Sequence, residues 1–400
     1  MPSLRQLHLE YLGQTSEFSL MLEVDHAKGM YIFDINGKSY LDLNSGISVS
    51  SLGHCHPAVV KAIKNQSEKY LHTMVYGEHV QSPQIKFAKL LLSQMDKKYE
   101  CLYYLMAGTE AVELSMKIAK KATGRYGLIS CSDAYHGSTQ GAESLRSDLD
   151  YKNSYFPLIP GVSHIRFNNH DDILLINERT AGVIIEAVQA EAGVIPPNTD
   201  FLKKVEKRCR NVGAIFIMDE IQTGFGRTGH LFAHQKYGII PDLILIGKAM
   251  GGGMPIAGVV GGKSVMNAIT KNPALGHITT FGGHPISSAA AHACLNTLLS
   301  EKIVSEVFEK ELLFHDLLKH NIIKEVRSSG LMMAVELTKR KYLKYVVNYT
   351  IENGALVDYF LFNDCSFRLA PPLIINEDQI RKGCKILLSA MDYAEQKYQK

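Results

Sequence analysis

Two charged residues stand at the ends of apolar runs in the middle of the chain. Lys248 follows the apolar part of LILIGKAMGGG (residues 243–253), and Asp219 ends the run AIFIMD (residues 214–219). If both runs are buried strands that end side by side, the two side chains share one pocket. A buried lysine can form a Schiff base with an aldehyde, and an aspartate can keep a pyridine nitrogen protonated. The pair therefore predicts pyridoxal phosphate chemistry, with Lys248 and Asp219 as catalytic residues.

Both residues also have simpler interpretations. A lone lysine in a loop is usually a solvated surface charge, and a strand-terminal aspartate often caps the next helix. A phosphate-binding P-loop is excluded, because Asp242 replaces its first glycine and Ala249 follows the lysine.

Five further positions are candidates for cofactor contacts. Gly108 and Thr109 stand between an apolar run and an amphipathic one, where free N–H groups and a helix dipole favour a phosphate. An ordinary threonine N-cap explains the same pattern. Thr280 is a second candidate for the phosphate, Tyr135 for stacking on a flat ring, and Gln222 for a ring hydroxyl. Core packing and loop polarity remain the alternatives for these three.

Composition excludes several classes of protein. A net charge of +3 in 400 residues, without a Lys/Arg block, argues against nucleic acid as a partner. No apolar stretch approaches membrane-spanning length, and the start lacks a signal-peptide core. Seven scattered cysteines without a CxxC pair fit free thiols in the cytoplasm. The sequence His54-Cys55-His56 lacks the spacing of a zinc site, so no metal is expected.

The apolar runs predict an α/β fold. Strands are expected at residues 102–106, 126–130, 182–187, 214–219, 242–247 and 256–261, and helices at 109–122, 200–211 and 285–299. Strands that are apolar throughout are typical of a mostly parallel sheet between helices, which binds ligands beyond its carboxyl ends.

Both chain ends are expected to form a smaller α+β domain. A hairpin is predicted around Asn36 and Gly37, and strands at 330–337 and 367–370. The expected division is an arm and part of the small domain at 1–45, a large cofactor-binding domain at 46–300 and the rest of the small domain at 301–400.

These motifs together resemble the class III, or ω-amino, aminotransferases of the fold-type I pyridoxal phosphate enzymes. The resemblance spans nearly the whole chain and is most similar to the acetylornithine/ornithine branch. Its most specific part is DEIQTGFGRTG (residues 219–229) followed by the lysine, and it also includes the segments GTEA (108–111), YHG (135–137), TFGG (280–283) and FRLAPPL (367–373).

The resemblance implies a role for each candidate. Lys248 would carry the cofactor and shuttle the proton, Asp219 would bind the pyridinium, and Thr280 would reach the phosphate from a second subunit, so a homodimer with its active site at the interface is expected. In related enzymes the matches to Glu191 and Arg368 form a gate. The arginine binds a carboxylate of glutamate and otherwise pairs with the glutamate side chain, since an unpaired buried arginine is costly. The second substrate pair is then glutamate and 2-oxoglutarate.

Two substrate positions depart from the family pattern. Enzymes that act on acetylornithine, ornithine or 4-aminobutyrate typically carry arginine where Ser138 stands, and ornithine enzymes tend to carry tyrosine at Ile47. A serine cannot replace a bidentate cation in binding a carboxylate, and Arg146 is a possible substitute.

The expected activity is transfer of a terminal amino group from a donor such as acetylornithine or ornithine to 2-oxoglutarate, giving an aldehyde and glutamate. The alternatives are a diamine, 4-aminobutyrate or other ω-amine aminotransferase, an aminomutase or racemase on the same scaffold, and a catalytically silent protein.

Overall fold

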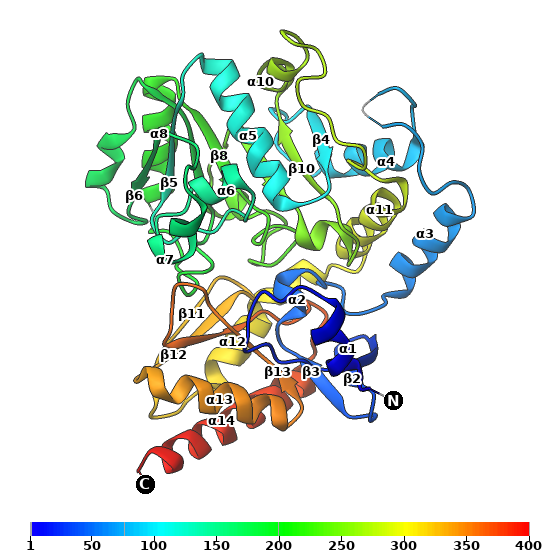
Figure 1. Cartoon of the computed structure of the whole chain (residues 1–400), viewed down its shortest axis with the longest axis vertical. Helices are drawn as coiled ribbons and strands as arrows, with labels where there is room; N and C mark the ends of the chain where they lie inside the picture. The colour runs from blue at the N-terminus through cyan, green and yellow to red at the C-terminus, as the bar shows by residue number, and fades with distance from the viewer. Residues whose placement is uncertain (1, 76, 199, 400) are drawn as a thin grey trace.

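A computed structural model describes residues 2–75, 77–198 and 200–399. The chain forms a large lobe from its middle part and a smaller lobe in which the blue N-terminal and orange-red C-terminal segments lie together (Figure 1).

A seven-stranded sheet forms the centre of the large lobe. In spatial order its strands are β4 (Cys101–Leu105), β10 (Ala257–Gly261), β9 (Leu243–Ile246), β8 (Ile215–Asp219), β7 (Thr180–Glu186), β5 (Gly127–Cys131) and β6 (Val162–Ile165). Strand β10 is antiparallel to both neighbours, whereas the β9–β8–β7–β5–β6 pairings are all parallel. The prediction of a mostly parallel α/β sheet is confirmed.

The central strands are apolar throughout because both sheet faces are covered. On β7, Ile184 packs into the cluster beneath helix α5, whereas Val183 and Ile185 pack into the cluster beneath α8. Strand β8 divides in the same way, with Ile217 on the α5 side and Phe216 on the α8 side. Each residue of these strands therefore contributes to a core, whichever face it lies on.

Local sequence sets the ends of the covering helices. Helix α5 (Gly108–Thr123) has an acid in its first turn and two lysines in its last, which suits the helix dipole. Helices α5 and α8 (Phe201–Val212) end at Gly124 and Gly213, both with φ of +70°, a conformation that glycine adopts without strain. The other helices of the large lobe are α3 (Pro57–Ser67), α4 (Ser82–Leu92), α6 (Gln140–Ser144), α7 (Leu149–Lys152), α9 (Ala233–Tyr237), α10 (Lys263–Met266) and α11 (Pro285–Ser300).

Two four-stranded sheets form the small lobe. One contains β1 (Val24–Lys28), β2 (Tyr31–Asp34), β3 (Ser39–Asp42) and β13 (Ala355–Leu356); the other contains β11 (Ile323–Ser328), β12 (Met333–Leu337), β15 (Ser366–Leu369) and β14 (Asp358–Tyr359). Because β13 pairs with β3, the two chain ends share one sheet, as predicted. The hairpin turn also forms, with Gly37 at φ +78° and the Asp34 carboxylate accepting the N–H groups of Asn36 and Lys38. The lobe is completed by α1 (Leu4–Tyr11), α2 (Ser45–Ser48), α12 (Val307–Leu317), α13 (Arg340–Glu352) and α14 (Glu377–Gln399).

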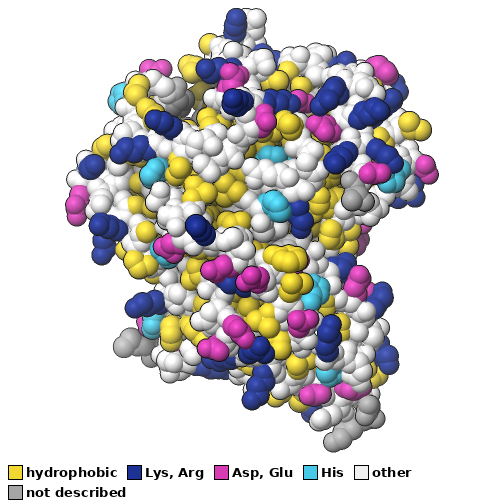
Figure 2. Space-filling view, turned by 180° about the vertical axis from the view of Figure 1, so that it is seen from behind, with side chains coloured by type: hydrophobic (Ala, Val, Ile, Leu, Met, Phe, Trp, Pro, Cys, Tyr) yellow, Lys and Arg dark blue, Asp and Glu magenta, His cyan; other side chains and the backbone are white. Residues whose placement is uncertain are grey.

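The surface carries both signs of charge. Lysine and arginine are interspersed with aspartate and glutamate over the face in Figure 2, and apolar side chains gather across the upper lobe. Within the described ranges, every helix is too short or too polar to cross a membrane.

Candidate active site

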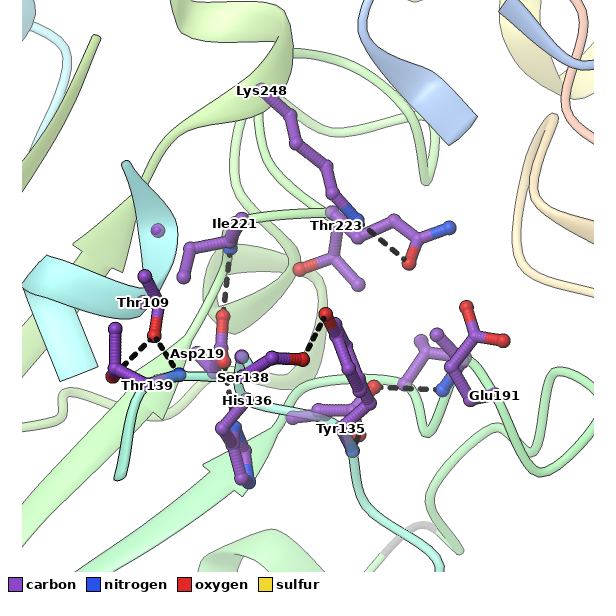
Figure 3. A pocket seen from close by; sticks show the side chains of 16 residues that line it. Thr109, Tyr135, His136, Ser138, Thr139, Glu191, Asp219, Ile221, Thr223 and Lys248 are labelled. Carbon is purple, nitrogen blue, oxygen red and sulfur yellow. Dashed lines mark hydrogen bonds and ion pairs between the residues drawn. The ribbon is translucent and has the colours of Figure 1, made fainter. Parts of the chain in front are cut away.

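A cavity of about 480 Å³ opens where the carboxyl ends of β7, β8 and β9 meet. Most of the predicted site residues line it, namely Gly108, Thr109, Tyr135, Ser138, Glu191, Asp219, Gln222 and Lys248. In Figure 3, Thr109 and Glu191 lie toward opposite ends of the cavity, with Asp219 and Lys248 between them.

Lys248 projects into this cavity from the segment that follows β9 (Figure 3). Its Nζ donates to Gln222 Oε1 at 3.3 Å. Burial, together with the positive charge of Arg368, lowers the pKa of Lys248. Its backbone is left-handed, with φ of +45°, a costly conformation for a residue with a side chain. The local fold therefore supplies a lysine that gives up its proton easily and is held in a strained position.

Asp219, at the end of β8, is buried and paired with a residue that the sequence did not single out. His136 Nδ1 lies 2.7 Å from Asp219 Oδ2, and the other carboxylate oxygen accepts the Ile221 N–H at 3.0 Å. Burial opposes a charge on His136, but the hydrogen bond and the charge of Asp219 outweigh it and raise the pKa of the imidazole. Asp219 thus accepts a hydrogen bond within a local turn rather than capping a helix. It lines the cavity, and its carboxylate is hydrogen-bonded to His136.

A second buried carboxylate, Glu186, lies beside this pair because β7 and β8 align Glu186 with Asp219. It accepts the main-chain N–H groups of Tyr135 at 3.0 Å and Ala190 at 2.8 Å. Burial raises the pKa of Glu186 to about 7, against the lowering effect of His136. The sequence indicated Glu186 only as part of a motif and gave no role for it.

At the other end of the cavity, the N-terminus of α5 meets the loop after Tyr135. The N-cap residue of α5 is Ala107, and the Thr109 hydroxyl lies 2.7 Å from the Thr139 hydroxyl instead of capping the helix. Glu113 fixes this loop by accepting the Thr139 hydroxyl at 2.5 Å and the Gly141 N–H at 2.9 Å. Two hydroxyls and the free N–H groups of a first helical turn form a cradle suited to an anion.

Gly137 allows this close approach. It has a φ of +127°, and a Cβ atom there would lie 2.4 Å from Thr109 Oγ1. Only glycine therefore lets the loop pack against the start of α5.

Glu191 and Arg368 are paired. Arg368 Nη2 donates to Glu191 Oε1 at 2.6 Å, and both residues are buried. Glu191 Oε2 also accepts the Leu361 N–H, while Arg368 lies over the Phe360 ring at 4.7 Å. Arg368 Nε and Nη1 are buried without a hydrogen-bond partner among the described residues. The guanidinium therefore has two nitrogens that can still donate hydrogen bonds to a ligand.

Ile47 and Thr280 are not part of the cavity wall within one chain. Ile47 lies in the turn α2, where four successive residues have positive φ, and it is partly exposed. The neighbouring Ser48 accepts from Gln222 at 3.5 Å, so the turn adjoins the cavity. Thr280 is exposed in the segment before α11.

His54 contacts a carboxylate, whereas the His56 Nδ1 has no hydrogen-bond partner among the described residues. His54 Nε2 lies 2.8 Å from Asp42 Oδ2, and His56 precedes α3, which starts at Pro57 as the sequence indicated. Across residues 2–75, 77–198 and 200–399, no group of three or more potential ligands is arranged to hold a metal ion.

The sequence and the fold were compared with known proteins. Residues 13–391 match the model of the family Aminotransferase class-III. An acetylornithine aminotransferase of Methanocaldococcus jannaschii is 36% identical over 400 residues, covering 97% of this chain and 96% of the relative. A [LysW]-aminoadipate semialdehyde/glutamate semialdehyde transaminase of Sulfolobus acidocaldarius is 33% identical over 385 residues, covering 94% and 96%.

Solved structures agree on the fold. The ornithine aminotransferase of Toxoplasma gondii superimposes with a TM-score of 0.91 at 29% identity, covering 99% of this chain and 95% of that one. A transaminase of a marine Virgibacillus reaches 0.93 at 24% identity and supports the fold alone. The chain therefore belongs to the class III aminotransferase family and is a transaminase.

Proposed function

We propose that this protein uses pyridoxal phosphate to move a terminal amino group from an amine donor to 2-oxoglutarate. The observation that carries the proposal is the placement of Lys248, the Asp219–His136 pair and an anion cradle around one cavity. The Toxoplasma gondii structure has pyridoxal phosphate at its active site in partial occupancy, and that protein shares the fold.

The residues present fit this cofactor. The cradle of Gly108, Thr109 and Thr139 suits a phosphate, and the buried Asp219 carboxylate at mid-cavity suits a protonated ring nitrogen. When bound, pyridoxal phosphate supplies an aldehyde carbon that takes up the amino group and a ring that withdraws electrons. Gln222 is the candidate for the ring hydroxyl, and Tyr135 for stacking on the ring.

The protein side chains then perform the proton chemistry. His136, whose pKa is raised mainly by its hydrogen bond to Asp219, holds that carboxylate in place, where it would keep a proton on the ring nitrogen. The lowered pKa of Lys248 favours the neutral amine, which could take a proton from the substrate carbon and return it at the next carbon.

Arg368 is the proposed carboxylate site for glutamate and 2-oxoglutarate. Once Glu191 leaves Nη2, this nitrogen together with the unpartnered Nε or Nη1 would form the bidentate contact that a carboxylate prefers. With an amine donor bound, the 2.6 Å contact to Glu191 neutralises the arginine instead. One site can therefore alternate between an acidic and a non-acidic substrate without leaving a buried charge unpaired.

The donor is a molecule with a terminal amine. Acetylornithine or ornithine is the proposed donor on the basis of the relatives, and a diamine, 4-aminobutyrate or another ω-amine is the alternative. Ser138 stands where acetylornithine, ornithine and 4-aminobutyrate enzymes typically carry arginine, which favours a diamine among the alternatives.

A homodimer is proposed as the active unit. Thr280 is exposed and outside the cavity wall, so it can reach a phosphate only in a second subunit. Large apolar side chains are exposed in the same segment, in the one before α4 and in α4 itself, namely Leu71, Met74, Val80, Ile85, Leu275, Ile278 and Phe281. A patch of this kind is typical of an interface between subunits.

The proposal is tested by titrating the protein, reconstituted with pyridoxal phosphate, with glutamate while its visible absorption is recorded. We expect a cofactor band that glutamate bleaches, and no bleaching and at least about 10³-fold slower transfer in Lys248→Ala. A band that glutamate leaves unchanged would contradict the role of Arg368 and favour an aminomutase. A protein that gives no band with added cofactor would contradict the cofactor proposal.

A further inference from the structure

A second cavity of about 370 Å³ adjoins the active site. Ser138 lines both cavities, so the two meet at this residue. Helices α6 and α7 contribute to it, and α7 lies at the edge of the large lobe that faces the small lobe (Figure 1). Thr15, from the N-terminal arm, also lines it. The cavity therefore lies where the far end of an extended amine donor would reach.

Arg146 is the cationic residue that lines this cavity, and its guanidinium is already paired with the Asp148 carboxylate. Its Nε donates to Asp148 Oδ2 at 3.0 Å, and Nη2 lies 3.4 Å from the other Asp148 oxygen. The guanidinium also lies over the Tyr151 ring at 4.4 Å and the Phe362 ring at 5.2 Å. Lys152, the other nearby cation, donates to the main-chain carbonyl of Arg146 and does not line the cavity. A substrate carboxylate would therefore compete with Asp148 for an arginine that is already paired.

Glu143 is the anion of the cavity, and it is poorly paired. Its side chain is only 7% exposed, yet its carboxylate accepts no hydrogen bond from any residue that the structure describes. Its one partner is Arg146 Nη1, at 3.4 Å. A carboxylate that lines a cavity and has unused acceptor sites can accept hydrogen bonds from a bound cation.

We propose that this second cavity binds an ammonium group at the far end of the amine donor, with Glu143 as its acceptor. This inference rests on the proposed function and names its donor class: a molecule with a terminal amine to be transferred and a second free amine. An α,ω-diamino acid and a diamine both carry that group.

Of the donors proposed above, the same contacts favour ornithine over its N-acylated form. Acylation converts the second amine into a neutral amide, which leaves Glu143 without a charged donor. It also leaves the substrate carboxylate as the only charge at that end, facing Glu143 and a paired Arg146. The Ser138 side chain cannot compensate, because a hydroxyl is no substitute for a guanidinium in binding a carboxylate. Tyr151 and Tyr155 add aromatic faces that favour a cation.

The test compares kcat/KM for ornithine, 1,4-diaminobutane and N-acetylornithine, with 2-oxoglutarate as the acceptor. We expect the two donors with a second free amine to exceed N-acetylornithine. In Glu143→Gln, kcat/KM for both should fall about 10- to 100-fold, the loss of one charge-assisted hydrogen bond. The kcat/KM for N-acetylornithine should not fall, because Glu143 repels its carboxylate, and the half-reaction with glutamate should be unaffected. Asp150→Asn, an exposed carboxylate on α7, is the matched control and should change nothing.

Ser138→Arg provides a second variant that does not depend on the stability of Glu143→Gln. Installing the arginine that the family carries should raise N-acetylornithine turnover and lower that of 1,4-diaminobutane. Arg146→Met distinguishes an α,ω-diamino acid from a diamine as the donor. It should lower kcat/KM for ornithine relative to 1,4-diaminobutane only if the α-carboxylate of ornithine binds Arg146.

The inference is overturned if N-acetylornithine is the best donor of the parent protein, or if Glu143→Gln leaves all three donors unchanged. It is also overturned if none of the three reacts while glutamate still does. Failure of the glutamate half-reaction itself would instead refute the proposed function.

Discussion

His136 Nδ1 lies 2.7 Å from Asp219 Oδ2, with both side chains buried at the floor of the active-site cavity. A neutral amide at position 136 could still donate one hydrogen bond to Asp219, but it would carry no positive charge. We therefore expect His136→Asn to lower kcat about 10²-fold with a small change in KM for glutamate, because the ring proton is held less firmly.

Asp219→Asn should be more severe than His136→Asn, because it removes the carboxylate itself. The measurement is single-turnover kinetics with glutamate. Equal losses in the two variants would show that His136 does more than support Asp219, and an unchanged rate in His136→Asn would refute its positioning role.

Arg368 should control the acidic substrate alone. In the double variant Glu191→Gln/Arg368→Met no buried charge is left unpaired, so the fold should be retained. KM for glutamate and for 2-oxoglutarate should rise about 10²-fold, the loss of a bidentate charged contact.

The amine half-reaction, followed by cofactor absorbance without 2-oxoglutarate, should stay within about threefold of the parent protein. A parallel loss for the amine donor would contradict a site reserved for carboxylates.

Much of this architecture follows from local pattern. Strands β7, β8 and β9 are detectable because both of their faces are buried, and parallel neighbours end at one edge, which brings Asp219 and Lys248 together. Strand β6, Val162–Ile165, was missed because a serine and a histidine interrupt its apolar pattern.

Long-range contacts could not be predicted in the same way. The pairing of His136 with Asp219 joins residues that are 83 positions apart, so no local window contains it. The Glu143 carboxylate accepts no hydrogen bond from the described residues because of how α6 and α7 pack around Arg146. Its neighbours in the sequence give no sign of this arrangement.

Glu186 and His136 should both make the folded protein less stable as pH rises. The pKa of Glu186 rises from 4.5 to about 7 on folding, so between these values the folded protein keeps a proton that the unfolded chain has lost. Stability therefore falls as pH rises through that window. The raised pKa of His136 acts in the same sense, because its contribution is lost as pH rises through the folded value.

Glu186→Gln removes the carboxylate and keeps one oxygen, so only one of the Tyr135 and Ala190 N–H groups retains its acceptor. Chemical denaturation of the cofactor-free protein should show a smaller fall in the free energy of unfolding between pH 5 and 7.5 in this variant. Parallel pH profiles for the two proteins would contradict a titrating Glu186.

Gly137 should be required for the anion cradle rather than for folding in general. In Gly137→Ala the new Cβ would meet Thr109 Oγ1 at 2.4 Å, so the loop must move away from the start of α5. We expect affinity for pyridoxal phosphate to fall at least about tenfold, through the loss of one hydrogen bond to a charged group. Gly124→Ala is the matched control, because Gly124 also has a positive φ but no atom within 4 Å of the added carbon. Backbone strain of roughly 1 kcal/mol should lower the unfolding temperature of both variants. Only Gly137→Ala should lose the cofactor. Equal cofactor affinity in the two variants would show that the Thr109–Thr139 contact does not hold the phosphate.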